Sequence, residues 1–503
     1  MSGIALGYGK PEETDVQAMM DKLPHRGGYL SGSAKHGKVV LMQNYLHADT
    51  GQAGKDARVP VKDSNGKCIC YDGQMGNAPE LGKKLGLEQG PFFEERIVLE
   101  LYRKHGIGMF EELGDTIFGL AISDGEDLLV ARDLLGIKTL FYGKKNDTTY
   151  VATELKALAA ITDDINEFPN GCYMDKSGEI KAFGELPKAP EVTNTKEIDE
   201  ICADIRDIIQ RSLDNRLDFH RPTASLLSGG LDSSVIAALA APMYKKVHGE
   251  KLKTFAVGIG GESSDIKGAR LMADHIDSDH YEYIVPLEDV IKILPDVIYY
   301  LENFDPSLVR SAAANFLISE HAKQHGVEVL LSGEGGDEVF CGYMYLKDYD
   351  ADELRKRQVE CLQYLHNNAS LRLDRMNESH SIRVVAPLVS GELLNYSLGV
   401  PPEYKQKPEG DKKVEKWIFR KAFENHLPNE ITWRLKQEFS QGSGSAGLLP
   451  SYFEDKFSAQ ELQDAQAEFP IIRSKEELYY FKLFTQYFGT GKAVETVGQW
   501  PCL

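Results

Sequence analysis

Serine and glycine residues near the middle of the chain have the chemistry needed to hold a phosphorylated ligand. The segment 226–234 reads Leu-Leu-Ser-Gly-Gly-Leu-Asp-Ser-Ser and leads from an apolar strand into a helical stretch. Two adjacent glycines let the backbone approach an anion, while serine hydroxyls and helix N-terminal amides can donate hydrogen bonds to it. Asp232 can hold Mg²⁺ against the phosphates. Because the Walker pattern is absent, the segment favours pyrophosphate binding and does not require γ-phosphoryl transfer.

A second acidic, glycine-rich segment follows another predicted strand. Residues 331–340 read Leu-Ser-Gly-Glu-Gly-Gly-Asp-Glu-Val-Phe, directly after the apolar run 327–331. Loops at the carboxyl ends of parallel strands meet at one edge of the sheet, so both segments can face one nucleotide. In this arrangement Asp337 can bind a metal ion and Glu334 can serve as a base.

The elements that must position these segments divide the chain into two parts. Residues 1–184 read as short strands with polar turns, and only 16–23 and 94–104 have helical periodicity, which predicts an α+β domain with a mostly antiparallel sheet. The polar, Pro-containing stretch 185–195 is the predicted linker. In 196–503 strands and helices alternate and then helices dominate, which predicts an α/β domain with a parallel, doubly wound sheet.

Composition limits the classes of protein to which the chain can belong. Its 503 residues are 42% hydrophobic and 27% charged, as in soluble globular proteins, which excludes disordered and fibrous classes. A net charge of -20 disfavours nucleic acid or anionic membrane as a partner. Seven scattered cysteines without a Cys-x-x-Cys pair, and the lack of a signal peptide or an 18-residue apolar run, predict a cytoplasmic protein.

Motifs along nearly the whole chain resemble those of the asparagine synthetase (glutamine-hydrolysing) family. In the second half the matching motifs are Ser-Gly-Gly-Leu-Asp-Ser-Ser, Ser-Gly-Glu-Gly-x-Asp-Glu-Val-Phe and Trp-Arg-x-Lys-x-x-Phe-Ser, the last at 433–440. In the first half they include Leu-Pro-His-Arg-Gly at 23–27 and Ala-Thr-Glu-Leu-Lys-Ala-Leu at 152–158. The resemblance implies an Ntn-hydrolase-like antiparallel sandwich, followed by an ATP-pyrophosphatase (PP-loop) domain with a helical C-terminal part.

The resemblance also implies a reaction and the residues that carry it. A carboxylate is activated by ATP to an acyl-adenylate, pyrophosphate leaves, and a nitrogen nucleophile then displaces AMP. The implied cofactors are ATP and Mg²⁺, with Asp232 and Asp337 as metal ligands, Lys436 stabilising charge on the phosphates and Glu334 removing a proton from the amine. The implied nucleotide contacts are Leu227, Ser228, Gly229, Gly230, Asp232, Ser233 and Ser234 for pyrophosphate, and Val257, Ser332 and Gly333 for adenosine.

The site for the carboxylic acid departs from the family's pattern. Arg310 stands where the family has an arginine for the substrate's α-carboxylate. Further along, the family's Glu-x-Arg-x-Pro-Phe-Leu-Asp has become Arg383-Val-Val-Ala-Pro-Leu-Val-Ser, so that an acid is replaced by Arg383 and an arginine by Val385. Two interpretations stay open: the acid differs from aspartate and lacks an ammonium group, or the change is a compensated structural one.

The glutaminase half has lost the residues on which its chemistry depends. Glutamine-dependent members use a cysteine at position two, an arginine and an Asn-Gly-Glu turn, and an aspartate before a helix. This chain has Ser2, Tyr45, Asp72 and Gln74 at the first four of these positions, and Glu94 near the helix start. An acid in place of the oxyanion-hole asparagine would repel an oxyanion. These changes predict that the domain no longer hydrolyses glutamine.

The leading hypothesis is therefore an AMP-forming synthetase that joins a carboxylic acid to ammonia or an amine. Small molecules are its predicted partners, and the resemblance implies a homodimer. Four alternatives remain: an ammonia-dependent asparagine synthetase, a β-lactam-synthetase-like enzyme that closes a ring within its own substrate, a non-catalytic pseudo-enzyme, and a hydrolase that uses Ser2 as its nucleophile.

Overall fold

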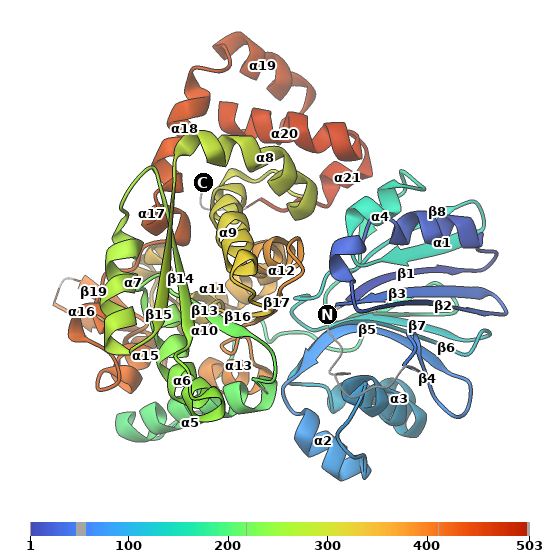
Figure 1. Ribbon diagram of the computed structural model, residues 1–503, viewed down its shortest axis with the longest axis horizontal. Coiled ribbons are helices and arrows are strands. Elements are labelled where there is room, and N and C mark those ends of the chain that lie inside the picture. The colour runs from blue at the N-terminus through green and yellow to red at the C-terminus, as the bar shows by residue number, and fades with distance from the viewer. Residues whose placement is uncertain (1, 47–56, 218, 411, 500–503) are drawn as a thin grey trace. The chain divides into compact units, whose positions relative to one another are not determined.

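The computed structural model describes residues 2–46, 57–217, 219–410 and 412–499. The chain forms two compact units, one made of Met1–Leu186 with Phe488–Thr496 and the other of Pro187–Tyr487 with Val497–Leu503 (Figure 1). The division after Leu186 falls inside the stretch 185–195 that was predicted as a linker. The first unit is built from antiparallel strands and the second around a parallel sheet, so the predicted order of an α+β and then an α/β fold is confirmed.

Two six-stranded antiparallel sheets form the first unit. One has the order β10-β8-β9-β1-β3-β2 and the other β12-β11-β7-β6-β5-β4. The strands are β1 (Ser2–Tyr8), β2 (Leu30–His36), β3 (Val39–Tyr45), β4 (Val61–Lys62), β5 (Cys68–Met75), β6 (Thr116–Ser123), β7 (Leu128–Arg132), β8 (Phe141–Lys145), β9 (Thr148–Ala152), β10 (Asn166–Glu167), β11 (Cys172–Asp175) and β12 (Ile180–Ala182). The unit's helices are α1 (Glu13–Met20), α2 (Ala78–Leu85), α3 (Phe93–His105), α4 (Leu155–Ala159) and α21 (Lys492–Glu495).

The core of this unit lies between the two sheets, with helices on both outer faces (Figure 1). Ile4 and Leu41 from one sheet meet Cys70 and Val130 from the other in one buried cluster. Strand β1 is buried on both faces because α1 covers the side that turns away from this cluster. This explains its run of small and apolar residues, whereas the edge strand β2 alternates between partly buried and exposed positions.

The second unit is built around a five-stranded parallel sheet of order β15-β14-β13-β16-β17. Its strands are β13 (Thr223–Leu226), β14 (Lys253–Ile259), β15 (Asp279–Val285), β16 (Val329–Leu331) and β17 (Arg383–Val385), and β18 (Gln406–Glu409) pairs with β19 (Lys412–Glu415) apart from it. Chain order reverses at β13, since β14 lies on one side and β16 on the other. Ligands bind outside the carboxyl ends of strands at such a switch point.

Helices pack around this sheet and form the C-terminal part of the unit (Figure 1). They are α5 (Ile198–Arg216), α6 (Leu231–His248), α7 (Ser264–His275), α8 (Leu287–Leu301), α9 (Pro306–Gln324), α10 (Gly336–Phe340), α11 (Ala351–Tyr364), α12 (Ala369–Glu378), α13 (Gly391–Leu398), α14 (Pro402–Lys405), α15 (Trp417–Phe423), α16 (Asn429–Thr432), α17 (Phe439–Ser443), α18 (Ser445–Glu454), α19 (Ala459–Glu468) and α20 (Lys475–Phe488).

The end of the chain corrects one predicted boundary. The segment Phe488–Thr496, which the sequence assigned to the second domain, belongs to the first unit. Lys492 Nζ donates to Asp164 Oδ1 at 2.7 Å, and Ala493 of α21 is buried. No local pattern in 488–496 could indicate this, because the partner lies more than 300 residues earlier in the chain.

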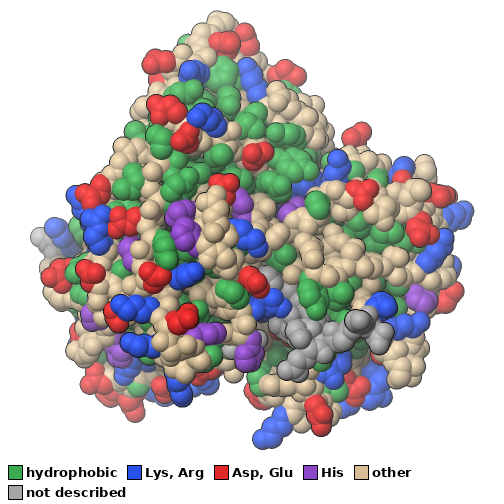
Figure 2. All heavy atoms as spheres, viewed as in Figure 1, with side chains coloured by type: hydrophobic (Ala, Val, Ile, Leu, Met, Phe, Trp, Pro, Cys, Tyr) green, Lys and Arg blue, Asp and Glu red, His purple; other side chains and the backbone are tan. Residues whose placement is uncertain are grey.

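Surface charge is mixed on the face drawn in Figure 2, where Lys and Arg side chains alternate with Asp and Glu. Ion pairs of the second unit, such as Arg270 with Glu282 and Lys251 with Asp277, join opposite charges at the surface. Within the described residues, no helix combines the length and the apolar character that spanning a membrane requires.

Candidate active site

A pocket at the carboxyl edge of the parallel sheet brings the two glycine-rich loops together. Of the residues predicted to contact nucleotide or to act in catalysis, its wall includes Leu227, Ser228, Gly230, Asp232, Ser233, Val257, Ser332, Gly333, Glu334, Asp337 and Lys436. Gly229 of the first loop and Ser234 of α6 are not part of this wall, and Ser234 is fully buried. The pocket lies entirely within the second unit.

Glycines in both loops are required by close backbone packing. A Cβ at Gly333 would lie 2.4 Å from the backbone carbon of Asp232, and one at Gly229 would lie 2.1 Å from the backbone of Gly268. Gly229 also has a φ of 66°, in the left-handed region that side chains disfavour. A larger residue at position 333 would push the two loops apart, and one at position 229 would push the first loop away from α7.

The first loop presents hydroxyl and amide groups at the start of α6. Ser228 Oγ lies 3.0 Å from Ser233 Oγ, and Gly230 N donates to Ser228 Oγ at 3.3 Å. The N-terminus of α6 begins at Leu231, so its dipole and free amides favour an anion in front of the loop. This geometry suits a pyrophosphate group.

Two carboxylates and two lysines face each other between the loops. Lys416 Nζ is 2.5 Å from Asp232 Oδ2 and 2.8 Å from Asp337 Oδ1, and Lys436 Nζ is 2.5 Å from Asp337 Oδ2. Burial would raise the pKa of Asp337, but the two ammonium groups hold it well below its usual value. Burial would lower the pKa of Lys436, but Asp337 and Asp232 raise it. Both groups are therefore charged at neutral pH.

Lys416 was not predicted from the sequence. It lies at the N-cap of α15, is almost fully buried, and adopts a φ of 53° that non-glycine residues rarely adopt. Such backbone strain, of order 1–3 kcal/mol, persists where the surroundings fix the residue. Nothing in the local sequence marks this lysine, because its partners come from two distant loops.

The carboxylates fit a Mg²⁺ ion held together with phosphates. Asp232 Oδ1 is buried without a hydrogen-bond partner, which leaves one oxygen for a metal. Mg²⁺ is usually bound by one or two carboxylates plus phosphate oxygens, and not by a closed protein cage. The described part of the chain contains no group of three His, Cys, Asp or Glu residues arranged for a metal.

Glu334, the predicted base, is ion-paired to Arg372 of α12. The Arg372 guanidinium also lies over the Phe439 ring, 5.3 Å from its centre. Both residues belong to the pocket wall, and neither was predicted from the sequence. Arg372 therefore fixes the orientation of the Glu334 carboxylate and brings a cation to this part of the pocket.

Arg434 fastens the segment that carries Lys436. Its guanidinium donates to the Ser228 carbonyl at 3.0 Å and to Asp265 Oδ1 at 2.9 Å. Burial raises the pKa of Asp265 to about 6, although Arg434 and Lys436 oppose this change. The ion pair joins three separate segments, namely the first loop, the N-terminus of α7 and the Lys436 segment.

The two arginines predicted to bind the carboxylic acid do not line the pocket. Arg310 forms a two-pronged ion pair with Glu476 of α20, with Nε 3.0 Å from Oε1 and Nη2 2.5 Å from Oε2. Tyr480 Oη donates to the same carboxylate at 2.9 Å. Removing one partner of such a buried ion pair costs about 3–5 kcal/mol of stability. The Arg310 side chain therefore stays bound to Glu476 of α20.

Arg383 lies at the wrong end of its strand to reach the pocket. It pairs in register with Val329 at the amino end of the sheet, whereas Val385 pairs with Leu331 next to the pocket loops. The residue that replaces the family's arginine, Val385, is buried and apolar. These placements correct the expectation for Arg310 and Arg383.

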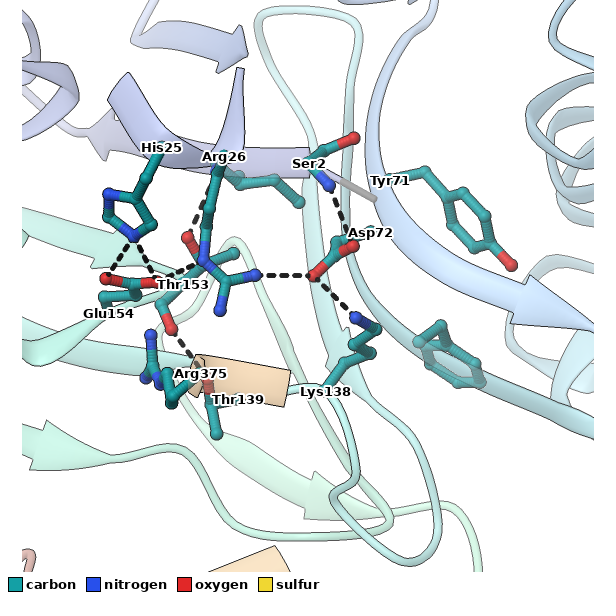
Figure 3. A network of polar contacts seen from close by, with 12 residues as sticks. Ser2, His25, Arg26, Tyr71, Asp72, Lys138, Thr139, Thr153, Glu154 and Arg375 are labelled. Atoms are coloured by element: carbon teal, nitrogen blue, oxygen red, sulfur yellow. Dashed lines mark hydrogen bonds and ion pairs between the residues drawn. The ribbon is translucent and has the colours of Figure 1, made fainter. Parts of the chain in front are cut away.

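A polar network in the first unit surrounds Ser2 (Figure 3). Ser2 N donates to Asp72 Oδ1 at 2.9 Å, and Gln43 Nε2 donates to Ser2 Oγ at 3.0 Å. The other Asp72 oxygen is 3.4 Å from Arg26 Nη1 and 3.5 Å from Lys138 Nζ. All of these side chains are buried. A buried carboxylate is therefore fixed within hydrogen-bonding distance of the Ser2 backbone nitrogen.

The remaining altered positions of this unit are also held internally. Tyr45 Oη donates to Glu95 Oε1 at 2.9 Å, while Glu94 accepts a 2.8 Å hydrogen bond from Tyr71 Oη. Tyr45 is thus paired with Glu95, while Glu94, named from the sequence as the acid near the helix start, is paired with Tyr71. Gln74 is buried on β5, two residues after Asp72.

Comparisons with known proteins agree with both halves of this description. The family model for asparagine synthase matches residues 204–360 and 349–482, and that for the glutamine amidotransferase domain matches 1–181. Asparagine synthetase [glutamine-hydrolyzing] 2 of Lotus japonicus is 31% identical over 502 residues, which cover 95% of this chain and 84% of that protein. The probable asparagine synthetase [glutamine-hydrolyzing] of Schizosaccharomyces pombe is 31% identical over 535 residues, or 97% of this chain and 93% of that protein.

Asparagine synthetase B [glutamine-hydrolyzing] of Escherichia coli is 30% identical over 504 residues, covering 95% of this chain and 88% of that protein. These matches extend over both units, and they include the loops whose geometry forms the pocket. The chain is therefore a member of the asparagine synthetase family, whose proteins are AMP-forming carbon–nitrogen ligases.

Proposed function

We propose that this chain uses ATP to convert a carboxylic acid and ammonia or an amine into an amide, without hydrolysing glutamine. The observation that carries the proposal is a contrast between two sites. In the second unit Asp232, Glu334, Asp337 and Lys436 converge on one pocket. In the first unit Asp72 turns a fixed negative charge toward Ser2.

The reaction follows from the positions of the pocket residues. The acid's carboxylate oxygen attacks the α-phosphorus of ATP, and the bond to pyrophosphate breaks. Lys416 and Lys436 offset the negative charge that develops on the departing pyrophosphate, which the first loop holds. Mg²⁺, bound by Asp232 and Asp337, would neutralise further phosphate charge. The nitrogen nucleophile then attacks the acyl carbon, AMP leaves, and Glu334 accepts a proton from the nitrogen.

Glutamine is an unsuitable nitrogen donor for this chain on electrostatic grounds. The relatives named above are glutamine-hydrolysing, whereas here Ser2 replaces the family's cysteine and Tyr45 replaces the cation for the substrate carboxylate. Attack on an amide creates an oxyanion, and Asp72 would repel it. A hydrolase that uses Ser2 is disfavoured for the same reason.

The direct test measures pyrophosphate and AMP formation with a panel of acids and three nitrogen conditions. Ammonia or an amine should support amide formation, while glutamine should give no more product than the reaction without a donor. Turnover with glutamine comparable to that with ammonia would contradict the proposal. Failure of every acid to support ATP–pyrophosphate exchange would favour the pseudo-enzyme alternative.

Restoring the nucleophile alone should not restore glutaminase activity. The Ser2→Cys variant is expected to release glutamate from glutamine only at background rate. Tyr45 still provides no cation for the glutamine carboxylate, and Asp72 still repels the oxyanion. Glutamate formation by coupled assay checks this, with ammonia-dependent amide synthesis in the same preparation as the positive control. Substantial glutamate release by Ser2→Cys would show that the pocket still binds glutamine.

Activity should rise with pH through about 6, because the Asp265 carboxylate must be ionised to hold Arg434. Folding raises the pKa of Asp265, so between about pH 4 and 6 this carboxyl keeps a proton in the folded protein that it releases in the unfolded chain. The contribution of Asp265 to the free energy of unfolding therefore falls as pH rises across that window. The kcat/KM for ATP measured from pH 5 to 8 should show the rising limb. Asp265→Asn should remove the limb, whereas Asp274→Asn, exposed on the same helix, should retain it.

A further inference from the structure

The wall of the pocket beyond the phosphate loops indicates which acids the enzyme accepts, an inference that rests on the proposed function. One face of α9 contributes Ser307, Ser311 and Asn315, which are spaced four residues apart. The α12 side contributes Ala369 and Arg372. Helices α9 and α12 pack against each other, and Arg372 of α12 pairs with Glu334, so we assign this part of the wall to the body of the acid.

A zwitterionic amino acid needs a cation for its α-carboxylate, and the pocket lacks the expected one. Arg310 lies three residues after Ser307 on α9, but it is not part of the pocket wall, and Glu476 occupies its guanidinium. Glu476 is itself buried and also bonded to Tyr480. A substrate carboxylate could pair with Arg310 only if the buried carboxylate of Glu476 lost its partner.

An amino acid also needs an anion for its ammonium group. Every acidic residue of the pocket wall is engaged: Asp232 by Lys416, Asp265 by Arg434, Glu334 by Arg372, Asp337 by Lys416 and Lys436, and Glu438 by the backbone of its own helix, α17. The oxygen of Asp232 that remains lies in the pyrophosphate loop. An ammonium group placed here would lose its hydration without a charge to replace it.

The polar atoms that face the acid can instead accept hydrogen bonds. Ser311 Oγ donates to carbonyls of its own helix, so its lone pairs remain available. The Asn315 side-chain nitrogen donates to Ser319 Oγ at 3.1 Å, which fixes the orientation of the amide. The side-chain oxygen of Asn315 is then the atom that can accept a hydrogen bond from a substrate. Acceptors on a neutral wall suit an uncharged donor such as a hydroxyl group.

We propose that the activated substrate is a hydroxy carboxylic acid without an ammonium group, with its hydroxyl donating to the Ser311–Asn315 face of α9. The arginine expected for an α-carboxylate and an unpaired acid for an ammonium group are missing from the described pocket wall, which has neutral hydrogen-bond acceptors on α9. The hydroxyl takes the place that an ammonium group has in an amino acid substrate.

Sets of acids that differ in one substituent test this proposal. The sets are aspartate, malate and succinate; alanine, lactate and propanoate; and phenylalanine, phenyllactate and phenylpropanoate. ATP–pyrophosphate exchange is measured with the full-length protein at equal acid concentrations. In the set that responds, the hydroxy acid should exceed the ammonium acid at least tenfold and should also exceed the unsubstituted acid.

The outcomes separate this inference from the proposed function. Exchange with the ammonium acid equal to or above that with the hydroxy acid would overturn the inference and leave the proposed function intact. An unsubstituted acid that matches the hydroxy acid would overturn the role of the hydroxyl group. No exchange with any acid would overturn the proposed function itself.

Two variants provide an independent check on α9. Asn315→Asp places a carboxylate on the pocket face and should shift the ratio of ammonium-acid to hydroxy-acid exchange at least tenfold toward the ammonium acid. Arg310→Lys, which weakens the pair with Glu476, should lower the melting temperature and leave that ratio unchanged. A raised KM for the acid in Arg310→Lys, without loss of stability, would show that Arg310 binds substrate.

Discussion

Replacement of Lys436 by alanine should lower acid-dependent pyrophosphate release by about 10²–10³-fold, the usual effect of removing one fixed donor to developing charge. Lys436 lies between Asp337 and the pyrophosphate loop, where its raised pKa keeps it charged throughout the working pH range. Its charge is held in place before the reaction starts, so none of its effect is lost to reorganisation. Single-turnover pyrophosphate release at saturating ATP measures the change.

A matched lysine separates this effect from a general loss of positive charge. Lys407 lies over the Trp417 ring, 4.3 Å from its centre, and is not part of the pocket wall. Lys407→Ala should retain the parent rate. If Lys436→Ala, folded as judged by its melting curve, loses less than tenfold, then Lys436 does not act on the phosphates and its role is limited to pairing with Asp337.

Replacement of Gly229 by alanine should reduce kcat/KM for ATP by about 100-fold or more, because displacement of a catalytic loop by about 1 Å can have that effect. The new Cβ would lie 2.1 Å from the Gly268 backbone, and the left-handed φ adds about 1–2 kcal/mol of strain. The first loop must therefore move away from α7. ATP–pyrophosphate exchange and ATP binding by calorimetry measure the result.

Gly249 provides the control for this substitution. It ends the same helix, α6, with a φ of 72°, but a Cβ there would meet nothing within 4 Å. Gly249→Ala should therefore lower stability by a similar strain energy and leave ATP binding unchanged. Equal loss of activity in the two alanine variants would indicate that strain in α6, and not the contact with Gly268, is responsible.

The phosphate-binding loops could be predicted because their chemistry is local. A strand, two glycines and the start of a helix place Ser228, Asp232 and Ser233 within one short segment, so the sequence alone indicates their common role. Lys416 and Arg372 could not be predicted in this way. Each reaches the pocket through tertiary packing, and its carboxylate partner lies at least 38 residues away in the chain.

The acid-binding residues show where a match to a motif is insufficient. Arg310 stands at the family's position, but a helix presents several faces, and Glu476 on α20 determines which way this side chain points. Likewise, the rotation of α3 determines that Glu94 contacts Tyr71 and Glu95 contacts Tyr45, because adjacent residues of a helix face different directions. The sequence predicted the helices in both cases but not the faces that they present.

The apolar runs 223–227, 253–258 and 327–331 predict strands and correspond to β13, β14 and β16, whereas the sequences of β15 and β17 do not predict strands. Strand β17 has three residues, too few for a period to be seen. Strand β15 lies at the edge of the sheet, and most of its residues are partly exposed. Its polar sequence, Asp-His-Tyr-Glu-Tyr-Ile-Val, is typical of an edge strand and hides the strand pattern.

The return of Phe488–Thr496 to the first unit affects the order in which the protein can fold during synthesis. About 300 residues separate Leu186 from this segment. At ribosomal rates of about 5–20 residues per second, the first unit waits roughly 15–60 s for its last helix, α21, after its sheets have left the ribosome. The surface of the first unit that Ala493 covers in the folded protein stays exposed for that time. We therefore predict that the nascent first unit binds chaperones until translation ends.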